Sequence, residues 1–343
     1  MRPEGSVYDV VRVCTDAIPL SLYRNSAEDA SRAVSSPEAV IHARARLGVE
    51  PMRIFFETHA AEVKPIASFH GHRVCAVDGT GFNVPDTAAN EAHFGRPKSS
   101  RGETAYPQMD AVSLVETSTS QILDMVFTHC DVPERLGVLK LLERLIRNDL
   151  LLMDRGISAA WLFAECLRRK IRILGRISST WKPHVIRRLG SGDFLVTVEG
   201  EIPKELRKNK KATVKLTLRM IEYKIGNNGT VRLLTDLLDP NEYPDMELAK
   251  LYHARWQIET SYDEIKNHLA TVASSAQDLV FRSKTPEGIL QEAYALAALY
   301  NMIRCLMAEA GAAAPKPESC QAKDEQVQGE TKKLQAEISR YRT

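Results

Sequence analysis

The residues best suited to chemistry lie in one short stretch, YHARWQIETSYDEIK, which runs from 252 to 266. Within it, Tyr252, Arg255, Glu259 and Lys266 are three, four and seven residues apart. On a helix that turns about 100° per residue, these side chains fall within roughly 60° of one another. One face would therefore carry a carboxylate that can hold a metal ion and two cations that can hold phosphate oxygens. The alternative interpretation is an ordinary solvated helix in which Arg255 and Glu259 form an i, i+4 ion pair.

Two aspartates occur in a second repeated pattern. Asp78 in HRVCAVDGT (72–80) and Asp154 in LLLMDRG (150–156) each follow a short apolar run and precede a glycine. The pattern predicts buried strands that end in an aspartate at the sheet edge, although either aspartate alone is also compatible with a turn or cap residue. Three carboxylates can hold two divalent cations about 3.5–4 Å apart for in-line phosphoryl displacement. We therefore expect Asp78, Asp154 and Glu259 to converge as catalytic metal ligands.

Together these motifs resemble those of DDE transposases of the insertion sequence 4 family. The 252–266 stretch matches the family's tyrosine–arginine–glutamate–lysine pattern at all four positions, and VDGT (77–80) and MDRG (153–156) match its two aspartate motifs. Three further segments resemble family sequences: NVPDTAANEAHFGRPKSSRG (83–102), AYPQMDAVSLVE (105–116) and RSKTPEGILQEAYALAALYNMIR (282–304). The resemblance covers about 37–307.

The resemblance implies a metal-dependent transposase, an endonuclease that cuts transposon ends and transfers the 3′ hydroxyl to target DNA. Asp78, Asp154 and Glu259 would bind two Mg²⁺ ions, for which Mn²⁺ can substitute, while Tyr252, Arg255 and Lys266 would position phosphates. The implied partner is double-stranded DNA, bound by a homodimer in the bacterial cytoplasm at the nucleoid, without membrane contact. Two alternatives stay open: a DNA-binding remnant or regulator without turnover, and a nuclease that hydrolyses DNA without joining it.

The fold expected is α/β: the resemblance implies a ribonuclease-H-like mixed sheet flanked by helices, interrupted by a β-rich insertion, with a helical N-terminal region. The predicted divisions are a helical region at 1–68, a catalytic core at 69–178 and 240–307, a basic insertion at 179–239 and a polar, flexible tail at 308–343. The predicted core strands are 74–77, 111–115, 122–128, 150–153 and 171–177, with helices at 133–147 and 158–169. Strands at 194–198, 214–225 and 230–238 would form the insertion, and one helix at 246–269 would carry Glu259.

Charge is distributed unevenly along the chain. The net charge is +2, but residues 155–235 hold eighteen Lys or Arg against six Asp or Glu. Such a cluster provides salt-sensitive binding to duplex DNA, with a merely solvated surface as the alternative. Alternating apolar and polar residues at 214–220 predict a basic strand face that includes Lys215 and Arg219. We expect Lys208, Lys210 and Lys211 to contact DNA from a loop, and Trp181 either to stack on a base or to pack.

Composition excludes several classes of protein. The hydrophobic fraction of 44% and charged fraction of 26% are ordinary for a globular protein. No apolar run reaches the roughly 18 residues of a membrane span, and the N-terminus lacks a signal-peptide pattern, so we expect a soluble intracellular protein. The six cysteines form no CxxC pair, which argues against a zinc knuckle or a disulfide framework.

Overall fold

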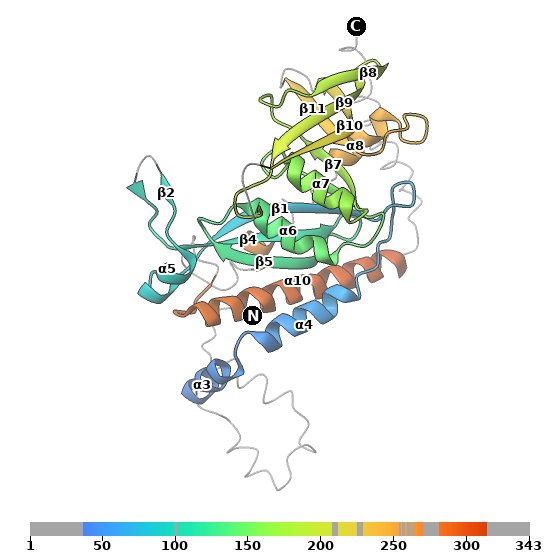
Figure 1. Ribbon diagram of the computed structural model, residues 1–343. Helices are drawn as coiled ribbons and strands as arrows, with labels where there is room; N and C mark the ends of the chain where they lie inside the picture. The colour runs from blue at the N-terminus through green and yellow to red at the C-terminus, as the bar shows by residue number, and fades with distance from the viewer. Residues whose placement is uncertain are drawn as a thin grey trace.

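The computed structural model of the chain is built around a nine-stranded mixed sheet in the order β5-β4-β1-β6-β7-β11-β10-β9-β8 (Figure 1). It describes residues 37–99, 102–207, 212–224, 229–253, 255, 258, 262, 264–269 and 281–313. The strands of the sheet are β1 (Val74–Asn83), β4 (Gln108–Glu116), β5 (Gln121–His129), β6 (Leu150–Met153), β7 (Arg172–Arg176), β8 (His184–Gly190), β9 (Asp193–Glu201), β10 (Thr213–Lys224) and β11 (Thr230–Thr235). A separate small hairpin consists of β2 (Lys98–Ser99) and β3 (Gly102–Glu103).

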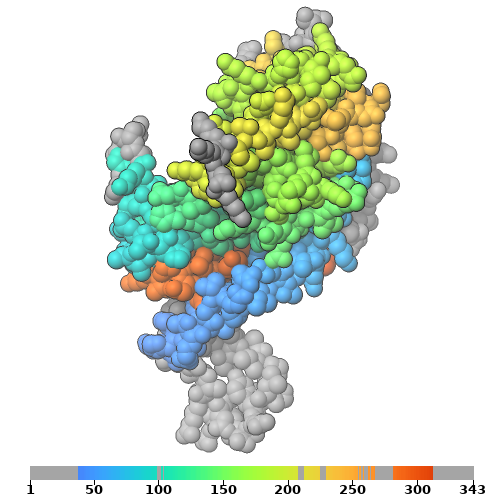
Figure 2. Space-filling model, in the orientation of Figure 1, coloured from blue at the N-terminus to red at the C-terminus, as the bar shows by residue number. Residues whose placement is uncertain are grey.

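Helices cover both faces of this sheet. They are α3 (Pro37–Leu47), α4 (Glu50–Ala61), α5 (Ala88–Phe94), α6 (Glu134–Leu141), α7 (Ala160–Arg168), α8 (Asp245–His253) and α10 (Pro286–Ala313), with a 3₁₀ turn η2 (Leu142–Arg144) and a π-helix η3 (Glu264–Leu269). Figure 1 shows α4 and α10 side by side along one face, and in Figure 2 their surfaces adjoin below the sheet. Helices α6 and α7 pack on the other face. The predicted class, an α/β protein with a mixed sheet flanked by helices, is confirmed.

The buried residues of the central strands alternate between two cores. Ala76 and Leu152 join a core with residues of α4 and α10, whereas Cys75, Val77 and Met153 join a second core with residues of α6 and α7. This alternation is what a strand buried on both faces requires, and it explains the continuous apolar runs before Asp78 and Asp154. The two runs are therefore fixed in direction and register by packing on both sides.

The connections around β1 determine whether the central strands pair parallel or antiparallel. Strand β1 pairs antiparallel with β4 and parallel with β6, and β6 pairs parallel with β7. The parallel pairs follow from the helical crossovers, because α7 returns the chain to the start of the next strand. The predicted core strands and the helix at 158–169 are all present. The helix predicted at 133–147 is shorter, since α6 tightens into the 3₁₀ turn η2 and Leu145 is already extended.

The strands of the predicted insertion extend the same sheet. Strand β11 pairs antiparallel with β7, and β10, β9 and β8 follow in order. The strand β8 was not predicted. The expected basic face of β10 is wrong for Arg219, whose side chain is completely buried and pairs with Asp193 at 2.7 Å. Lys215 does lie on the exposed side, where it pairs with Glu199 at 3.0 Å.

The helix predicted at 246–269 is wrong as one regular α-helix. Helix α8 ends at His253, and Arg255 lies in a turn where its amide donates to the Tyr252 carbonyl at 3.2 Å, before the helical residues Ile258 and Tyr262. Residues 264–269 then form π turns, which advance the chain by fewer degrees per residue. A constant 100° per residue therefore does not hold across this segment. Glu259 lies outside the described residues.

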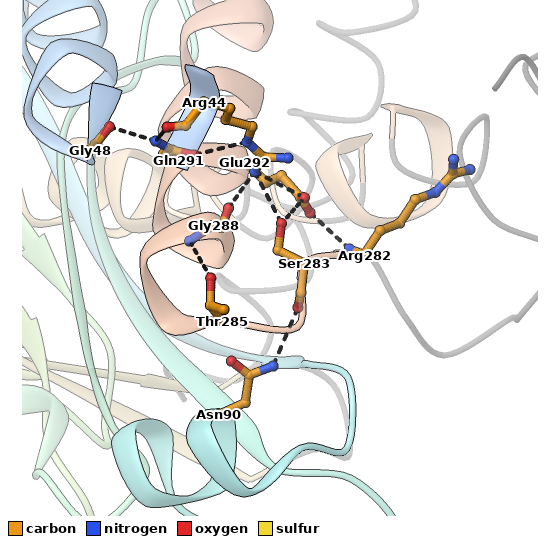
Figure 3. Close-up of polar contacts among 9 residues, drawn as sticks. All are labelled: Arg44, Gly48, Asn90, Arg282, Ser283, Thr285, Gly288, Gln291 and Glu292. Carbon is orange, nitrogen blue, oxygen red and sulfur yellow. Dashed lines mark hydrogen bonds and ion pairs between the residues drawn. The ribbon is translucent and has the colours of Figure 1, made fainter. Parts of the chain in front are cut away.

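A polar network joins the N-terminal helices to α10 (Figure 3). Helix α3 ends at Leu47, because Gly48 adopts a φ of 70° that favours glycine. The Arg44 guanidinium donates to Gln291 Oε1 at 2.8 Å and to the Gly288 carbonyl at 2.7 Å, and Gln291 donates back to the Gly48 carbonyl at 2.6 Å. These bonds fix the turn between α3 and α4 against the start of α10.

Two further expectations concern the ends of the chain and its relation to membranes. Helix α10 continues to Ala313, so 308–313, predicted as part of the flexible tail, are helical. The remainder of that tail, and residues 1–36 of the predicted helical region, lie outside the described residues. Within the part of the chain that the structure describes, no helix is long and apolar enough to cross a bilayer.

Candidate active site

The structure places Asp78 and Asp154 side by side. Val77 of β1 is the register partner of Met153 at the end of β6, so the next residue of each parallel strand is one of the two aspartates. Neighbouring strands lie about 4.8 Å apart, which puts the two backbones within reach of shared ligands. The two apolar runs thus place a pair of carboxylates next to each other. Strand β6 ends directly before Asp154 as predicted, whereas β1 continues through Asp78 to Asn83, so the predicted end of that strand is wrong.

Local hydrogen bonds orient the two carboxylates. The Gly79 amide donates to Asp78 Oδ1 at 2.9 Å, and the Ile157 amide donates to Asp154 Oδ1 at 2.7 Å. The Ser158 amide also donates to the Asp154 carbonyl at 3.0 Å, which closes the turn after β6. Among the described residues, no hydrogen bond reaches the second carboxylate oxygen of Asp154. That oxygen is available to a cation.

The helical segment after α8 brings its cations to the same edge. Arg255 Nη1 lies 3.2 Å from Asp78 Oδ2, and both side chains are largely buried. Lys266 Nζ donates to the Gly81 carbonyl at 2.8 Å and lies 4.9 Å from the centre of the Phe82 ring. Burial lowers the pKa of Lys266, and Asp110 partly opposes this. Arg255 and Lys266 thus flank Asp78, although in this state they bind protein atoms.

Two tyrosines of this segment are buried in the core. Tyr252 packs at the end of α8, where burial raises its pKa and the neighbouring Arg255 opposes the shift. Tyr262 packs in the core, and its hydroxyl also donates to the Asp78 carbonyl at 2.7 Å and accepts from the Ser113 amide at 3.1 Å. Tyr262 therefore ties the segment to β1 and β4 directly beneath Asp78. Nothing in its sequence position distinguished it from a simple core residue.

Sequence reasoning did not find two further acids at this edge, Asp110 of β4 and Glu134 at the start of α6. Burial raises the pKa of Asp110, opposed by His129 and Lys266. Burial also raises the pKa of Glu134, and the negative charges of Asp154 and Asp110 raise it further. The available signal was the position of Glu134 at the start of the helix predicted at 133–147, in DVPER (131–135).

Trp181 lies in the β-rich part of the chain, next to Phe163 of α7. Trp181 is half-buried and packs against Phe163, with ring centres 6.0 Å apart, so the packing interpretation holds for most of its surface. It also lines a groove of about 1060 Å³ together with Arg135, Ser158, Lys182, Arg207 and Lys215. Lys208, Lys210 and Lys211 lie outside the described residues, like Glu259. Some of the positive charge of residues 155–235 is neutralised within the protein, since Arg168 and Arg169 both pair with Glu165.

Comparison with known proteins identifies the family. A family model described as "Transposase DDE domain" matches residues 69–302, which contain Asp78, Asp154 and the 252–266 stretch. The chain belongs to this family of transposases. It is 32% identical over 287 residues to "Transposase InsG for insertion sequence element IS4" of Escherichia coli strain K12. That match covers 81% of this transposase but only 62% of the relative's length.

Solved structures of transposases also resemble this one. A piggyBac transposase synaptic complex with hairpin DNA matches 75% of this chain and 50% of its own, with a TM-score of 0.48 and 12% identity. The Mos1 transposase paired-end complex with the left transposon end matches 49% of this chain and 59% of its own, with a TM-score of 0.21 and 13% identity. The assignment to the transposase family depends on the sequence matches alone.

Proposed function

We propose that this transposase cuts transposon ends in a metal-dependent reaction and transfers the liberated 3′ hydroxyl to target DNA. The observation that carries the proposal is that Asp78 and Asp154 directly follow Val77 and Met153, which are register partners in two parallel strands. The strand order supports a ribonuclease-H-like core, because three antiparallel strands precede two parallel ones joined through helices. Glu259 would supply the third carboxylate from the segment whose described residues Arg255 and Tyr262 already contact Asp78.

The donor set fits a pair of hard divalent cations. Asp78, Asp154 and Glu259 offer only oxygen ligands, which Mg²⁺ prefers and Mn²⁺ accepts. The Asp154 oxygen that receives no hydrogen bond from the described residues, and the negative charges around it, favour a cation there. Two bound ions would activate the attacking oxygen and stabilise the leaving oxygen at phosphorus.

The neighbouring side chains would position the DNA backbone. Arg255 now pairs with Asp78, and a cation on that carboxylate would free its guanidinium for a phosphate. Lys266 would hold a second phosphate from its place above Gly81, and the buried Tyr252 would support Arg255. These roles explain why the segment combines cations with a carboxylate.

Double-stranded DNA would continue from this edge into the groove beside α7. Arg135 and Ser158 line the groove and also contact the turn after Asp154, so the groove begins next to the proposed metal site. Lys182, Arg207 and Lys215 bring positive charge to its far side, and Trp181 could stack on an exposed base. We propose that a homodimer binds two ends in this way in the bacterial cytoplasm.

Cleavage assays on transposon-end DNA with Mg²⁺, Mn²⁺ and Ca²⁺ test the function. We expect cleavage with Mg²⁺ or Mn²⁺, binding without cleavage in Ca²⁺, and joined products when target DNA is added. Binding without cleavage in every metal would instead support a DNA-binding regulator. Nicks without joined products would indicate a nuclease.

Replacing Lys208, Lys210 and Lys211 together with neutral residues tests whether this loop contacts the DNA backbone. If each lysine contacts a phosphate, the slope of log affinity against log salt should become shallower by about 0.9 per contact, or about 2.7 in all. Cleavage at saturating DNA should change little, because the carboxylates are untouched. Fluorescence anisotropy at several salt concentrations measures the slope. Lys64→Gln, at an exposed position three residues after the end of α4, is the control. An unchanged slope in the triple variant would indicate that the three lysines belong to a solvated loop.

A further inference from the structure

We propose that Tyr262 is a positioning residue of the proposed metal site, and that its hydroxyl holds Asp78 in place through the backbone of β1. The inference rests on the proposed function, because it concerns one carboxylate of that site. The Tyr262 ring belongs to the core that contains Ala76 of β1 and residues of α10. Its hydroxyl donates to the Asp78 carbonyl at 2.7 Å and accepts from the Ser113 amide at 3.1 Å.

The two groups that this hydroxyl joins belong to opposite residues of the sheet. Asp78 is the register partner of Ser113 in the antiparallel pair of β1 and β4. In such a ladder, every second pair of residues exchanges hydrogen bonds. The Thr117 amide donates to the Val74 carbonyl at 3.0 Å, and counting by twos along both strands from this pair leads to Asp78 and Ser113. The phenol therefore lies at a hydrogen-bonded pair of the ladder and holds β1 and β4 together at Asp78.

Strand β1 loses one of its two neighbours at Asp78. Its parallel pairing with β6 ends at Val77 and Met153, whereas its pairing with β4 continues through Asp78 to Asn83. From Asp78 onward, β1 thus has a paired strand on one side only among the described residues. A segment held from one side opens more readily than one that is paired on both. The bond from Tyr262 strengthens the remaining connection and so limits the movement of the Asp78 carboxylate.

The hydroxyl approaches from the same face of the sheet as the Asp78 side chain. Side chains alternate along a strand, and Ala76 and Phe82, which point the same way as Asp78, belong to the core that contains Tyr262. Arg255, seven residues before Tyr262, places Nη1 3.2 Å from Asp78 Oδ2. The 252–266 stretch therefore contacts both the carbonyl and the carboxylate of Asp78, which fixes the distance between them and this stretch.

Packing alone does not account for the hydroxyl. Phenylalanine would fill nearly the same volume without a buried polar group, which costs free energy unless it is hydrogen-bonded. Burial raises the pKa of Tyr262, so the hydroxyl keeps its proton and can donate. Removing a group that orients the ligands of a metal ion commonly lowers metal affinity about tenfold to a hundredfold. We expect an effect of this kind from the bond to the Asp78 carbonyl.

Tyr262→Phe removes only the hydroxyl, and Mn²⁺ titration of the full chain without DNA, followed by electron paramagnetic resonance, measures the consequence. We expect Mn²⁺ affinity to fall about tenfold, and the Mg²⁺ concentration for half-maximal cleavage to rise by a similar factor. Cleavage at saturating Mg²⁺ should fall much less, because every metal-binding side chain is still present.

The matched control is Tyr300→Phe. Tyr300 is also buried, and its hydroxyl donates to the Ser120 carbonyl at 2.9 Å in the turn between β4 and β5. Each variant loses one buried hydrogen bond, so both melting temperatures should fall by a few degrees. Only Tyr262→Phe should bind Mn²⁺ more weakly, since a merely structural hydroxyl would lower stability without changing metal affinity.

A further protein separates the hydrogen bond from the rest of the side chain. The amine of para-aminophenylalanine at position 262 keeps a donor to the Asp78 carbonyl, so Mn²⁺ affinity should return to near the wild-type value. The proposal is overturned if Tyr262→Phe binds Mn²⁺ as tightly as Tyr300→Phe, or if the amine restores nothing. Normal Mg²⁺-dependent cleavage by the wild type would leave the proposed function intact in either case. If Mn²⁺ binding needs the Tyr262 hydroxyl but the wild type cuts no DNA, the positioning role stands and the proposed function fails.

Discussion

Replacing Asp154 with asparagine is expected to lower the rate of metal-dependent cleavage of transposon-end DNA about a thousandfold. Asparagine keeps an oxygen that can accept the Ile157 amide, so the turn after β6 is preserved while the ligand charge is lost. Weakening a two-metal site removes several kcal/mol of transition-state stabilisation, and about 4 kcal/mol corresponds to this loss in rate. Single-turnover cleavage in Mg²⁺ at saturating DNA measures it. Glu259→Gln should have the same effect.

The control for this experiment is Asp131→Asn. Asp131 follows β5, and its carboxylate is mostly exposed, so the same chemical change there should leave cleavage near the wild-type rate. DNA affinity in Ca²⁺ should be similar in all three proteins, since neither aspartate is expected to contact phosphate directly. Normal cleavage by Asp154→Asn would contradict the assignment of this residue. Loss of both binding and cleavage would indicate damage to the fold.

The central strands and their aspartates could be predicted from sequence because both depend on local patterns. The runs before Asp78 and Asp154 are apolar at every position, as strands covered on both faces require, and a glycine follows soon after each aspartate. Their adjacency adds only one assumption, that the two strands are parallel neighbours. Cations near the site could be predicted as well, since Arg255 and Lys266 lie in the same motif.

Other features depend on distant residues that no local pattern specifies. Strand β8 lies at the sheet edge with nearly all of its residues exposed, so it has no apolar alternation to reveal it. Glu134 meets Gly79 only because α6 packs across the strands, and its sequence neighbours resemble any helix start. The π turns at 264–269 likewise change a rotation that a helical wheel assumes constant. Arg219 was misplaced because alternation distinguishes two faces but does not tell which polar residue is buried.

Arg219→Met is expected to lower the free energy of unfolding by about 3–5 kcal/mol, the usual loss when one partner of a buried ion pair is removed. The Arg219 side chain is fully buried, its Nε and Nη2 donate to the Asp193 carboxylate at 2.9 and 2.7 Å, and its Nη1 donates to the Tyr243 carbonyl at 2.7 Å. Methionine would fill much of the volume but leave the Asp193 charge and the Tyr243 carbonyl without donors. Urea unfolding followed by circular dichroism measures the change.

Two further variants decide whether the loss of stability comes from the unpaired Asp193 charge. Adding Asp193→Leu to Arg219→Met removes the uncompensated carboxylate, so most of the stability should return, while the unpaired Tyr243 carbonyl retains a loss of about 1–3 kcal/mol. Lys215→Met on the same strand breaks the exposed pair with Glu199 and should cost no more than about 1 kcal/mol. If Arg219→Met lowered the free energy of unfolding as little as Lys215→Met, the Arg219–Asp193 pair would contribute little to the stability of the β8–β11 strands. A double variant no more stable than Arg219→Met would instead attribute the loss to packing, because removing the second charge would then have relieved nothing.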